Sequence, residues 1–275
     1  MVSLANIGGP LYEFYGYIAD GVYKDKQEIE THLWGEIPEN GYDRYTTVFV
    51  GDVKYRDLDG DGQITPLDRT SIGSPLPKFT YGLNNTFSYR DFDLTVFLQG
   101  SYGNKIFNAL NRDLTGMGWN TNQLRIAMDY ANLIPVSASK EYPFVDDYGR
   151  SINNWFEDID NVRLSNPTTT MSRAGRGLPY NNSRTSTRYI EDGSYLRVRN
   201  ILLGYTVPKK WLRKAQIEDV RVYLNIQNLW TFTKYSGYDP EVGINPQDAS
   251  GNTFGYDMGR YPAPRLISFG LNVSF

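Results

Sequence analysis

The residues best suited to chemistry form one acidic run, Asp57–Asp68, in which carboxylates alternate around two glycines. Alternate aspartates in a tight turn direct their oxygens toward one point, where without a cation their charges repel each other. The run also has a glycine at its sixth position, a backbone carbonyl at its seventh and a carboxylate at its twelfth, which is the ligand spacing of a calcium loop. The sequence therefore predicts calcium bound by Asp57, Asp59, Asp61, Gln63 through its carbonyl, and Asp68.

This loop departs from a regulatory EF-hand in two ways. Asp68 stands where the EF-hand has glutamate, and its shorter side chain reaches less easily for a bidentate contact. The flanking helices are also missing, because residues 51–56 have an extended pattern and Pro66 would interrupt a second helix. We expect a structural clip on a long loop. The alternative is a metal-free Asp-Gly turn held by hydrogen bonds from side chains to the backbone.

Composition excludes several classes of function. The net charge of −3 argues against a protein that binds nucleic acid phosphates. The 275 residues include no cysteine, which excludes thiolate metal sites, and one histidine, His32, on which any Ser-His-Asp relay would depend. No two carboxylates stand at the ends of neighbouring predicted strands, where a glycosidase would need them. We therefore expect no enzymatic activity.

The elements that must position the acidic run are β-strands. Residues 266–275 alternate between apolar and polar side chains without a break, which is the period of a strand with one apolar and one polar face. Similar alternation recurs earlier in the chain, and a bulge near Asn200 would keep one of these strands in phase. The predicted strands are residues 78–89, 92–102, 191–207, 219–232 and 264–275.

Two all-β arrangements fit these strands. In a soluble sandwich the apolar face would be a dry core, whereas in an outer-membrane barrel it would face lipid and the polar face would line a wet lumen. The polar side chains on the second face and the alternation of long and short connections favour the barrel. We expect the lipid side to carry Leu94, Val96, Leu98, Leu224, Ile226, Phe269 and Leu271, and the lumen side to carry Asp93, Gln99, Arg221, Gln227 and Asn272.

Helices are a minor part of this pattern. Residues 121–133 predict a helix capped by Thr121 and stopped by Pro135, and residues 26–32 tolerate one. No apolar run approaches the roughly 20 residues of a helix that spans a membrane. Met1 is followed by no signal sequence, so either the protein stays inside the cell or its true start is missing.

Several runs of the sequence carry a resemblance to a known family. They are residues 51–108, 188–200 (RYIEDGSYLRVRN), 228–230, 235–241 and 261–275. In this order they resemble the C-terminal part of the SusC/RagA family of TonB-linked, or TonB-dependent, outer-membrane transporters. The likeness thins between residues 109 and 187, where Ser172 stands in place of the proline that is usual in the family.

The resemblance implies a plugged barrel of about 22 strands. It implies uptake of glycan or peptide fragments across the bacterial outer membrane. TonB would supply energy through the missing N-terminal part, and a SusD-like lipoprotein would bind the oligosaccharide or peptide outside; no nucleic acid partner is implied. The alternative function is that of a secreted β-sandwich binding module with a dockerin-like calcium loop.

The predicted domain organisation is a single antiparallel transmembrane β-barrel segment over residues 1–275. It is all-β, and its five or six strands form an open curved sheet with unpaired edges near residues 11–23 and at the final strand. Long extracellular loops are expected at residues 24–77, 103–190 and 233–263. Calcium in the first of these loops would give the barrel rim a fixed surface for a lid partner.

Overall fold

The computed structural model describes residues 3–4, 8–117, 122–174, 182–213, 217–244 and 254–275. The chain divides into two compact units. The first unit comprises residues 1–5, 13–73 and 108–190, and the second comprises residues 6–12, 74–107 and 191–275. Among the described helices, none combines the length and the apolar character needed to cross a membrane.

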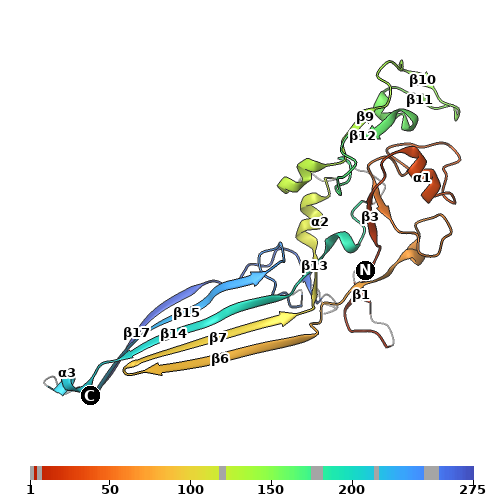
Figure 1. The fold of residues 1–275 in the computed structure, drawn as a ribbon. Coiled ribbons are helices and arrows are strands. Elements are labelled where there is room, and N and C mark those ends of the chain that lie inside the picture. The colour runs from red at the N-terminus through yellow and green to blue at the C-terminus, as the bar shows by residue number, and fades with distance from the viewer. Residues whose placement is uncertain (1–2, 5–7, 118–121, 175–181, 214–216, 245–253) are drawn as a thin grey trace. The chain divides into compact units, whose positions relative to one another are not determined.

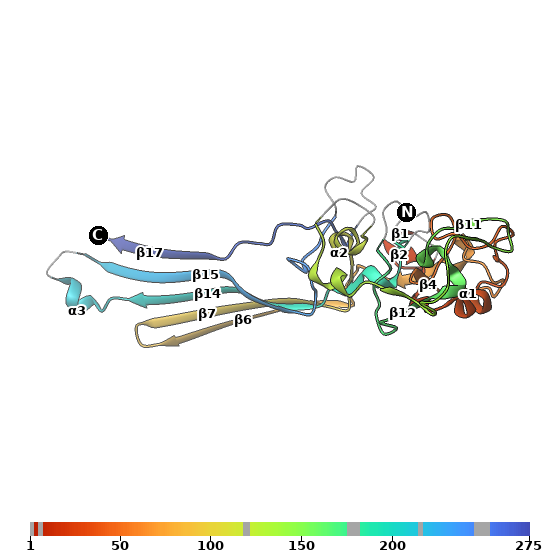
Figure 2. The ribbon, with the colours of Figure 1, turned by 90° about the horizontal axis from the view of Figure 1, so that it is seen from above.

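The second unit is built on a five-stranded antiparallel sheet, drawn as the long arrows of Figures 1 and 2. Its strand order, β17-β15-β14-β7-β6, makes it an open meander with β6 and β17 at the edges. The strands are β6 (Phe79–Tyr89), β7 (Phe92–Tyr102), β14 (Tyr195–Thr206), β15 (Asp219–Thr233) and β17 (Leu266–Ser274). The prediction of an open antiparallel sheet is confirmed.

One predicted edge of this sheet is wrong. Residues 11–23 contain β2 (Glu13–Gly16) and β3 (Ala19–Val22), which pair with short strands of the first unit instead. The edge of the large sheet is β6, because its one partner there is β7. The bulge predicted near Asn200 is confirmed, since the register of β14 shifts between Val198 and Asn200 against both of its neighbours.

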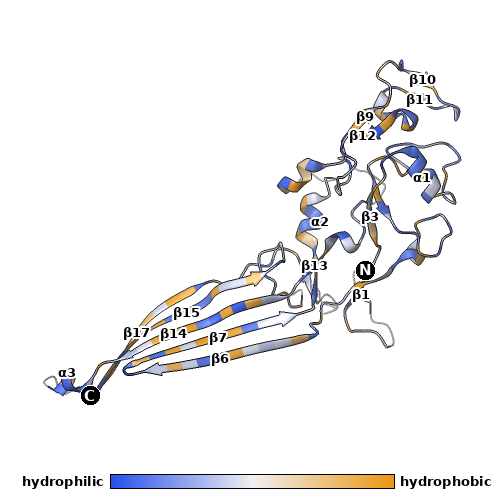
Figure 3. Ribbon diagram, viewed as in Figure 1, coloured by the Kyte–Doolittle hydropathy of each residue, from blue (hydrophilic) through white to orange (hydrophobic). Residues whose placement is uncertain are grey.

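The register sorts the side chains of the sheet by face, because paired residues of antiparallel strands lie on the same side. Leu203 pairs with Leu94 and Leu224, and Leu224 pairs with Phe269, so one apolar row crosses four strands. The same four strands contribute a second apolar row, which consists of Val96, Ile201, Ile226 and Ile267. Figure 3 shows the alternation of apolar and polar residues along these strands.

The apolar face is exposed. Phe87 is 61% exposed, Phe269 82% and Leu271 61%, so no described residue covers them as a second sheet would. This contradicts the sandwich alternative, in which these side chains would form a dry core. Smaller elements lie wholly or mainly in the second unit. They are α3 (Lys209–Leu212) and a three-stranded sheet in which β8 (Lys105–Asn108) lies between β13 (Ile190–Asp192) and β16 (Tyr256–Asp257).

The first unit consists of short strands and helices. Its strands are β1 (Ser3–Leu4), β2 and β5 (Thr70–Gly73) in one sheet, and three pairs: β3 with β4 (Val53–Tyr55), β9 (Leu133–Pro135) with β12 (Val162–Leu164), and β10 (Phe144–Val145) with β11 (Ser151–Ile152). Its helices are α1 (Lys26–His32), α2 (Ala109–Thr115) and 3-10 turns at Pro66–Asp68, Arg125–Asp129, Trp155–Glu157, Ile159–Asn161 and Thr187–Tyr189.

An apolar core joins some of these short elements, among them α1, β3, β4 and β12. Helix α1 begins where the Asp25 carboxylate accepts the N–H of Glu28, and it buries Ile29 against that core. The core also fully buries Tyr23, Phe49, Val50 and Tyr55. The complete cluster consists of Tyr17, Val22, Tyr23, Ile29, Leu33, Tyr42, Val48, Phe49, Val50, Val53, Tyr55, Ile64, Ala131, Ile159, Val162 and Leu164.

The helix predicted at residues 121–133 is wrong for the described residues. Residues 125–129 form one 3-10 turn, and Leu133 already belongs to β9, which pairs with β12. Pairing with a distant strand therefore overrides the local helical tendency. The predicted cap, Thr121, lies outside the described residues.

Candidate functional site

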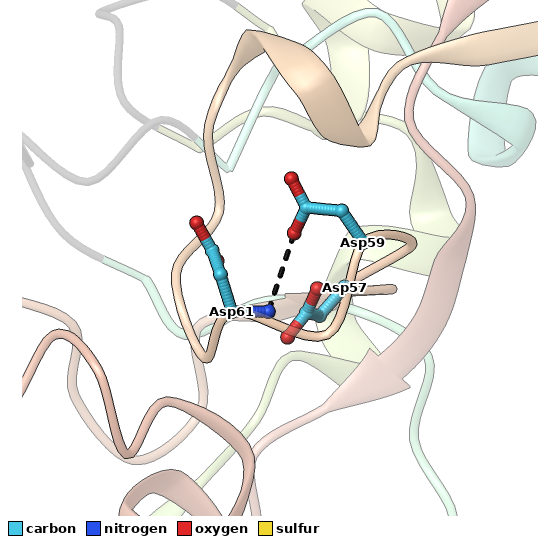
Figure 4. A group of neighbouring side chains, drawn as sticks. All are labelled: Asp57, Asp59 and Asp61. Atoms are coloured by element: carbon cyan, nitrogen blue, oxygen red, sulfur yellow. Dashed lines mark hydrogen bonds between the residues drawn. The ribbon is translucent and has the colours of Figure 1, made fainter.

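The acidic run lies between β4 and β5, and three of its predicted ligands converge there. Each of Asp57, Asp59 and Asp61 offers one carboxylate oxygen, and these three oxygens lie within 4.8 Å of one another. Figure 4 shows the three side chains grouped around the turn. Gly60 and Gly62 have φ angles of +78° and +76°, in the left-handed region that glycine adopts without strain. A side chain at Gly62 would also collide with Gly35, since its Cβ would lie 2.5 Å from the Gly35 nitrogen.

Backbone hydrogen bonds fix the three aspartates in this turn. Asp57 accepts the N–H groups of Gly60 at 2.6 Å and Gly62 at 2.8 Å. Asp59 accepts the N–H of Asp61, and Asp61 in turn accepts the N–H of Gln63. Asp57 thus accepts through both of its oxygens, whereas these bonds use one oxygen each of Asp59 and Asp61. Carboxylate oxygens and backbone carbonyls such as that of Gln63 are the groups that a hard cation prefers.

The fifth predicted ligand, Asp68, makes different contacts. It is fully buried, and its two oxygens accept the N–H of Leu58 at 2.8 Å and the N–H of Thr65 at 2.7 Å. Thr65 and Asp68 form a capping box around the 3-10 turn at Pro66–Asp68. Asp68 thus joins the two ends of the loop, and the converging group of carboxylates is Asp57, Asp59 and Asp61.

The electrostatics of the loop differ from one aspartate to the next. Loss of hydration raises the pKa of Asp57, but the N–H groups of Gly62 and Gly60 outweigh it and hold that pKa below its ordinary value. Loss of hydration raises the pKa of Asp59, and repulsion from Asp61, Asp68 and Asp57 raises it further. A cation at this point would relieve that repulsion, and oxygen-only donors of this kind are those that calcium accepts.

The polar face of the large sheet forms a second candidate site. Arg221 of β15 donates to Asp93 of β7 at 2.6 Å, so the ion pair spans β14, which lies between them. It passes over Gly204, where a Cβ would lie 2.4 Å from an Asp93 oxygen and 2.6 Å from an Arg221 nitrogen. A glycine is therefore needed at this point of β14.

A second ion-pair cluster lies farther along the same face. Arg197 is 3% exposed and donates to Asp239 at 2.5 Å, to Glu241 at 2.8 Å and to Thr231 at 2.9 Å. Arg199 also reaches Glu241 at 3.1 Å. The N–H of Ala263 donates to the second oxygen of Asp239 at 3.1 Å. This cluster thus joins the runs 188–200, 235–241 and 261–275, which are distant in sequence.

A cleft adjoins this cluster on the polar side. Its volume is about 760 Å³, and its lining includes Gln99, Arg199, Asn228, Glu241, Arg260 and Tyr261. Clefts of this size accept a small ligand or a peptide side chain. The sheet therefore presents a charged and hollowed surface on one side and an apolar surface on the other.

The first unit also contains a buried ion pair that the sequence pattern does not predict. Asp52 is fully buried and accepts from Arg173 Nε at 2.7 Å and from Asn182 at 2.9 Å. Its second oxygen accepts the N–H of Phe49 at 2.8 Å. No local pattern signals this pair, because Arg173 lies 121 residues from Asp52 in the chain.

An open antiparallel sheet with an exposed apolar face and a polar face has the pattern of a membrane β-barrel segment, and comparisons with known proteins bear on that interpretation. No protein-family model matches the chain. TonB-dependent receptor P3 of Formosa agariphila is 33% identical over 270 residues, which cover 98% of this chain and 22% of that receptor. TonB-dependent receptor SusC of Bacteroides thetaiotaomicron is 24% identical over 276 residues, 98% of this chain and 22% of SusC.

Solved structures share the fold. The RagAB peptide transporter matches 99% of this chain and 24% of the solved chain with a TM-score of 0.61 at 21% identity. The RagAB peptide importer in its open-open state matches 96% of this chain and 22% of the solved chain, with a TM-score of 0.58 at 19% identity. The chain spans about a fifth of the length of the curated relatives it matches. It is thus a segment of a SusC/RagA-like TonB-dependent transporter.

Proposed function

We propose that this chain forms a membrane-spanning segment of an outer-membrane importer energised by TonB. The observation that carries the proposal is the exposed apolar face of the five-stranded sheet. Its strands are 9 to 15 residues long, and a tilted strand needs about 9–11 residues to cross a bilayer. The polar face then lines the lumen, where the Arg221–Asp93 pair and the Arg197 cluster are hydrated or contact other parts of the transporter.

Aromatic residues at both ends of the apolar face support this orientation. At one end Phe79 lies 5.3 Å from Tyr102, measured between ring centroids, and Trp230 lies 6.4 Å from Phe232. At the other end Phe92 of β7 lies 4.6 Å from Tyr205 of β14. The aliphatic rows of Leu203 and Ile201 lie between these ends. Aromatic girdles that flank an apolar band mark the two interfaces of a bacterial barrel.

The partners belong to the same proposal and rest on the relatives. Two of the similar structures are named as a peptide importer and a peptide transporter, and SusC is named as a TonB-dependent receptor. We propose that the complete protein imports peptide or glycan fragments, that a SusD-like lipoprotein binds them outside, and that TonB acts through parts of the transporter beyond this chain. Its role is transport rather than catalysis.

A charge placed on either face tests the membrane-spanning role. In the complete transporter, Leu224→Arg puts a guanidinium on the proposed lipid side and is expected to cost about 2–4 kcal/mol near the midplane. Its neighbour Asn225 pairs with Leu202 and Ser268 on the other face, so Asn225→Arg is the matched control. We expect only Leu224→Arg to reduce the amount of folded, heat-modifiable barrel in the outer-membrane fraction. Equal yields for both variants would show that the orientation is wrong.

We further propose that the acidic loop binds calcium as a structural ion. Asp57, Asp59 and Asp61 would hold it together with the carbonyl of Gln63, and the buried Asp68 would brace the loop around it. Calcium suits this oxygen-only set because it accepts flexible coordination by six to eight oxygens, whereas magnesium needs a tight octahedron. Its role would be to order a loop that a lid partner contacts.

Calorimetric titration of the complete transporter with calcium tests this site. The double variant Asp59→Ala with Asp61→Ala is expected to abolish binding at this loop. Asp147→Ala is the matched control, because Asp147 is exposed and lies outside the acidic run. Unchanged calcium binding by the double variant would refute the assignment.

A further inference from the structure

Two arginines of the first unit lie against one tyrosine ring. The guanidinium carbon of Arg69 lies 5.3 Å from the ring centroid of Tyr17, and that of Arg184 lies 5.1 Å from the same centroid. Arg69 also donates from Nε to the Tyr17 hydroxyl at 3.2 Å. Arg69 comes directly after the acidic loop, whereas Arg184 belongs to a segment far along the chain, so the fold brings the two cations together.

The backbone holds these groups in place. The N–H of Tyr17 donates to the carbonyl of Thr185 at 2.9 Å, and the N–H of Thr187 donates back to the carbonyl of Tyr17 at 3.0 Å. Gly16 permits this approach, since a Cβ there would lie 2.4 Å from the Thr185 oxygen. Arg184 also donates to the carbonyl of Ile64 at 3.3 Å. These hydrogen bonds therefore hold the segment that carries Arg184 against the segment that carries Tyr17.

A cavity of about 410 Å³ opens between them. Its walls are formed by Tyr15, Gly16, Tyr17, Ile64, Pro66, Arg69, Arg184 and Thr185. The volume lies within the range of sites that bind small molecules. Among its described residues the wall carries two arginines and no aspartate or glutamate, so a carboxylate inside the cavity would meet cationic donors directly.

We propose that this cavity binds a carboxylate attached to a small apolar or ring-shaped body. A guanidinium presents a planar fork of N–H donors that matches a carboxylate, and it keeps this fork while it lies against an aromatic ring. The tyrosine, isoleucine and proline walls would contact the body of the ligand. Two sources supply such a group: the C-terminus or an acidic side chain of a peptide, and a uronic acid of a glycan.

Two probe pairs separate the charge of the ligand from its shape. Purified complete transporter in detergent is titrated with N-acetylphenylalanine against N-acetylphenylalaninamide, and with glucuronate against glucose. We expect at least one carboxylate to bind and its neutral counterpart to bind at least about tenfold more weakly, as the loss of a charge-assisted contact predicts. The pair that shows this difference identifies the source of the carboxylate.

Variants then assign the binding to this cavity. Arg69→Gln is expected to weaken binding of the carboxylate probe about tenfold or more. Arg69→Lys is expected to weaken it less, because lysine keeps the charge and loses the planar fork of donors. Arg163→Gln, which removes an exposed arginine of β12 in the same unit, is expected to leave affinity unchanged. The proposal is overturned if neither carboxylate binds, if the neutral probes bind equally well, or if both Arg69 variants retain full affinity. Binding is read without transport, so this result and a test of transport are independent.

Discussion

The two units use the same residue types in opposite ways. In the first unit Phe49 and Tyr55 are fully buried, whereas on the large sheet Phe87 is 61% and Phe269 82% exposed. Charges do not follow this contrast, since each unit buries one ion pair, Asp52–Arg173 in the first and Arg197–Asp239 in the second. The first unit thus has its own core, and the apolar face of the sheet depends on an apolar medium outside the chain.

The largest effect is expected from breaking the buried pair of the first unit. Asp52→Ala leaves Arg173 buried without its carboxylate and also removes the acceptor of the Phe49 and Asn182 hydrogen bonds. Removal of one partner from such a pair costs about 3–5 kcal/mol. We expect proteolysis of the complete transporter to cut the first unit much faster, while the heat-modifiable barrel persists.

The exposed Asp147 again provides the control, since Asp147→Ala should leave the rate of cleavage unchanged. If Asp52→Ala disturbed both units equally, they would not differ in the source of their stability. If it disturbed neither, the buried pair would contribute nothing to the first unit.

A smaller effect, which depends on pH, is expected from the Arg197 cluster of the second unit. Burial raises the pKa of Asp239, but the N–H groups of Glu241 and Ala263 and the charge of Arg197 outweigh it, so the folded-state pKa lies below the ordinary value of about 4. The contribution of Asp239 to stability is therefore complete above about pH 4, and it is lost as the pH falls through the folded-state pKa.

Asp239→Asn tests this sign. At pH 7 the variant is expected to lower the free energy of unfolding by about 1.5–3 kcal/mol, the usual value for hydrogen bonds to a charged group. In denaturant titrations at decreasing pH, wild type and variant should converge below about pH 4. A difference that stays constant with pH would mean that the carboxylate charge does not act in the folded state.

The sequence predicts the large sheet well because one physical rule governs it. A strand between two different media must alternate its side chains, and the predicted strands at residues 92–102 and 219–232 match β7 and β15 within one residue at each end. The bulge near Asn200 is predicted by the same rule, because without it Val198 and Ile201 would lie on opposite faces of the sheet.

The structure of the first unit cannot be predicted from the sequence in the same way. Its strands, such as β4 with three residues and β10 with two, are too short to show a period. Its contacts also join distant residues, as Arg173 does with Asp52 and Arg184 does with Tyr17. The acidic loop is the exception, because its spacing is local and brings Asp57, Asp59 and Asp61 together, although Asp68 is bonded to backbone N–H groups.

One pair of neighbouring leucines tests the central account most directly. Leu202 pairs with Asn225 and Thr95 on the polar face, whereas Leu203 pairs with Leu224 and Leu94 on the apolar face. Hydrophobicity does not distinguish the two residues, but the register assigns one to the lumen and the other to lipid. This chain has no cysteine, so Leu202→Cys and Leu203→Cys each introduce one labelling site in it.

The measurement is the quenching of a fluorophore on each cysteine by spin-labelled lipid, with the complete transporter in bilayers and its other cysteines removed. We expect strong quenching at Leu203→Cys and little at Leu202→Cys. Equal quenching at both positions, or stronger quenching at Leu202→Cys, would contradict the assignment of the apolar face to the membrane.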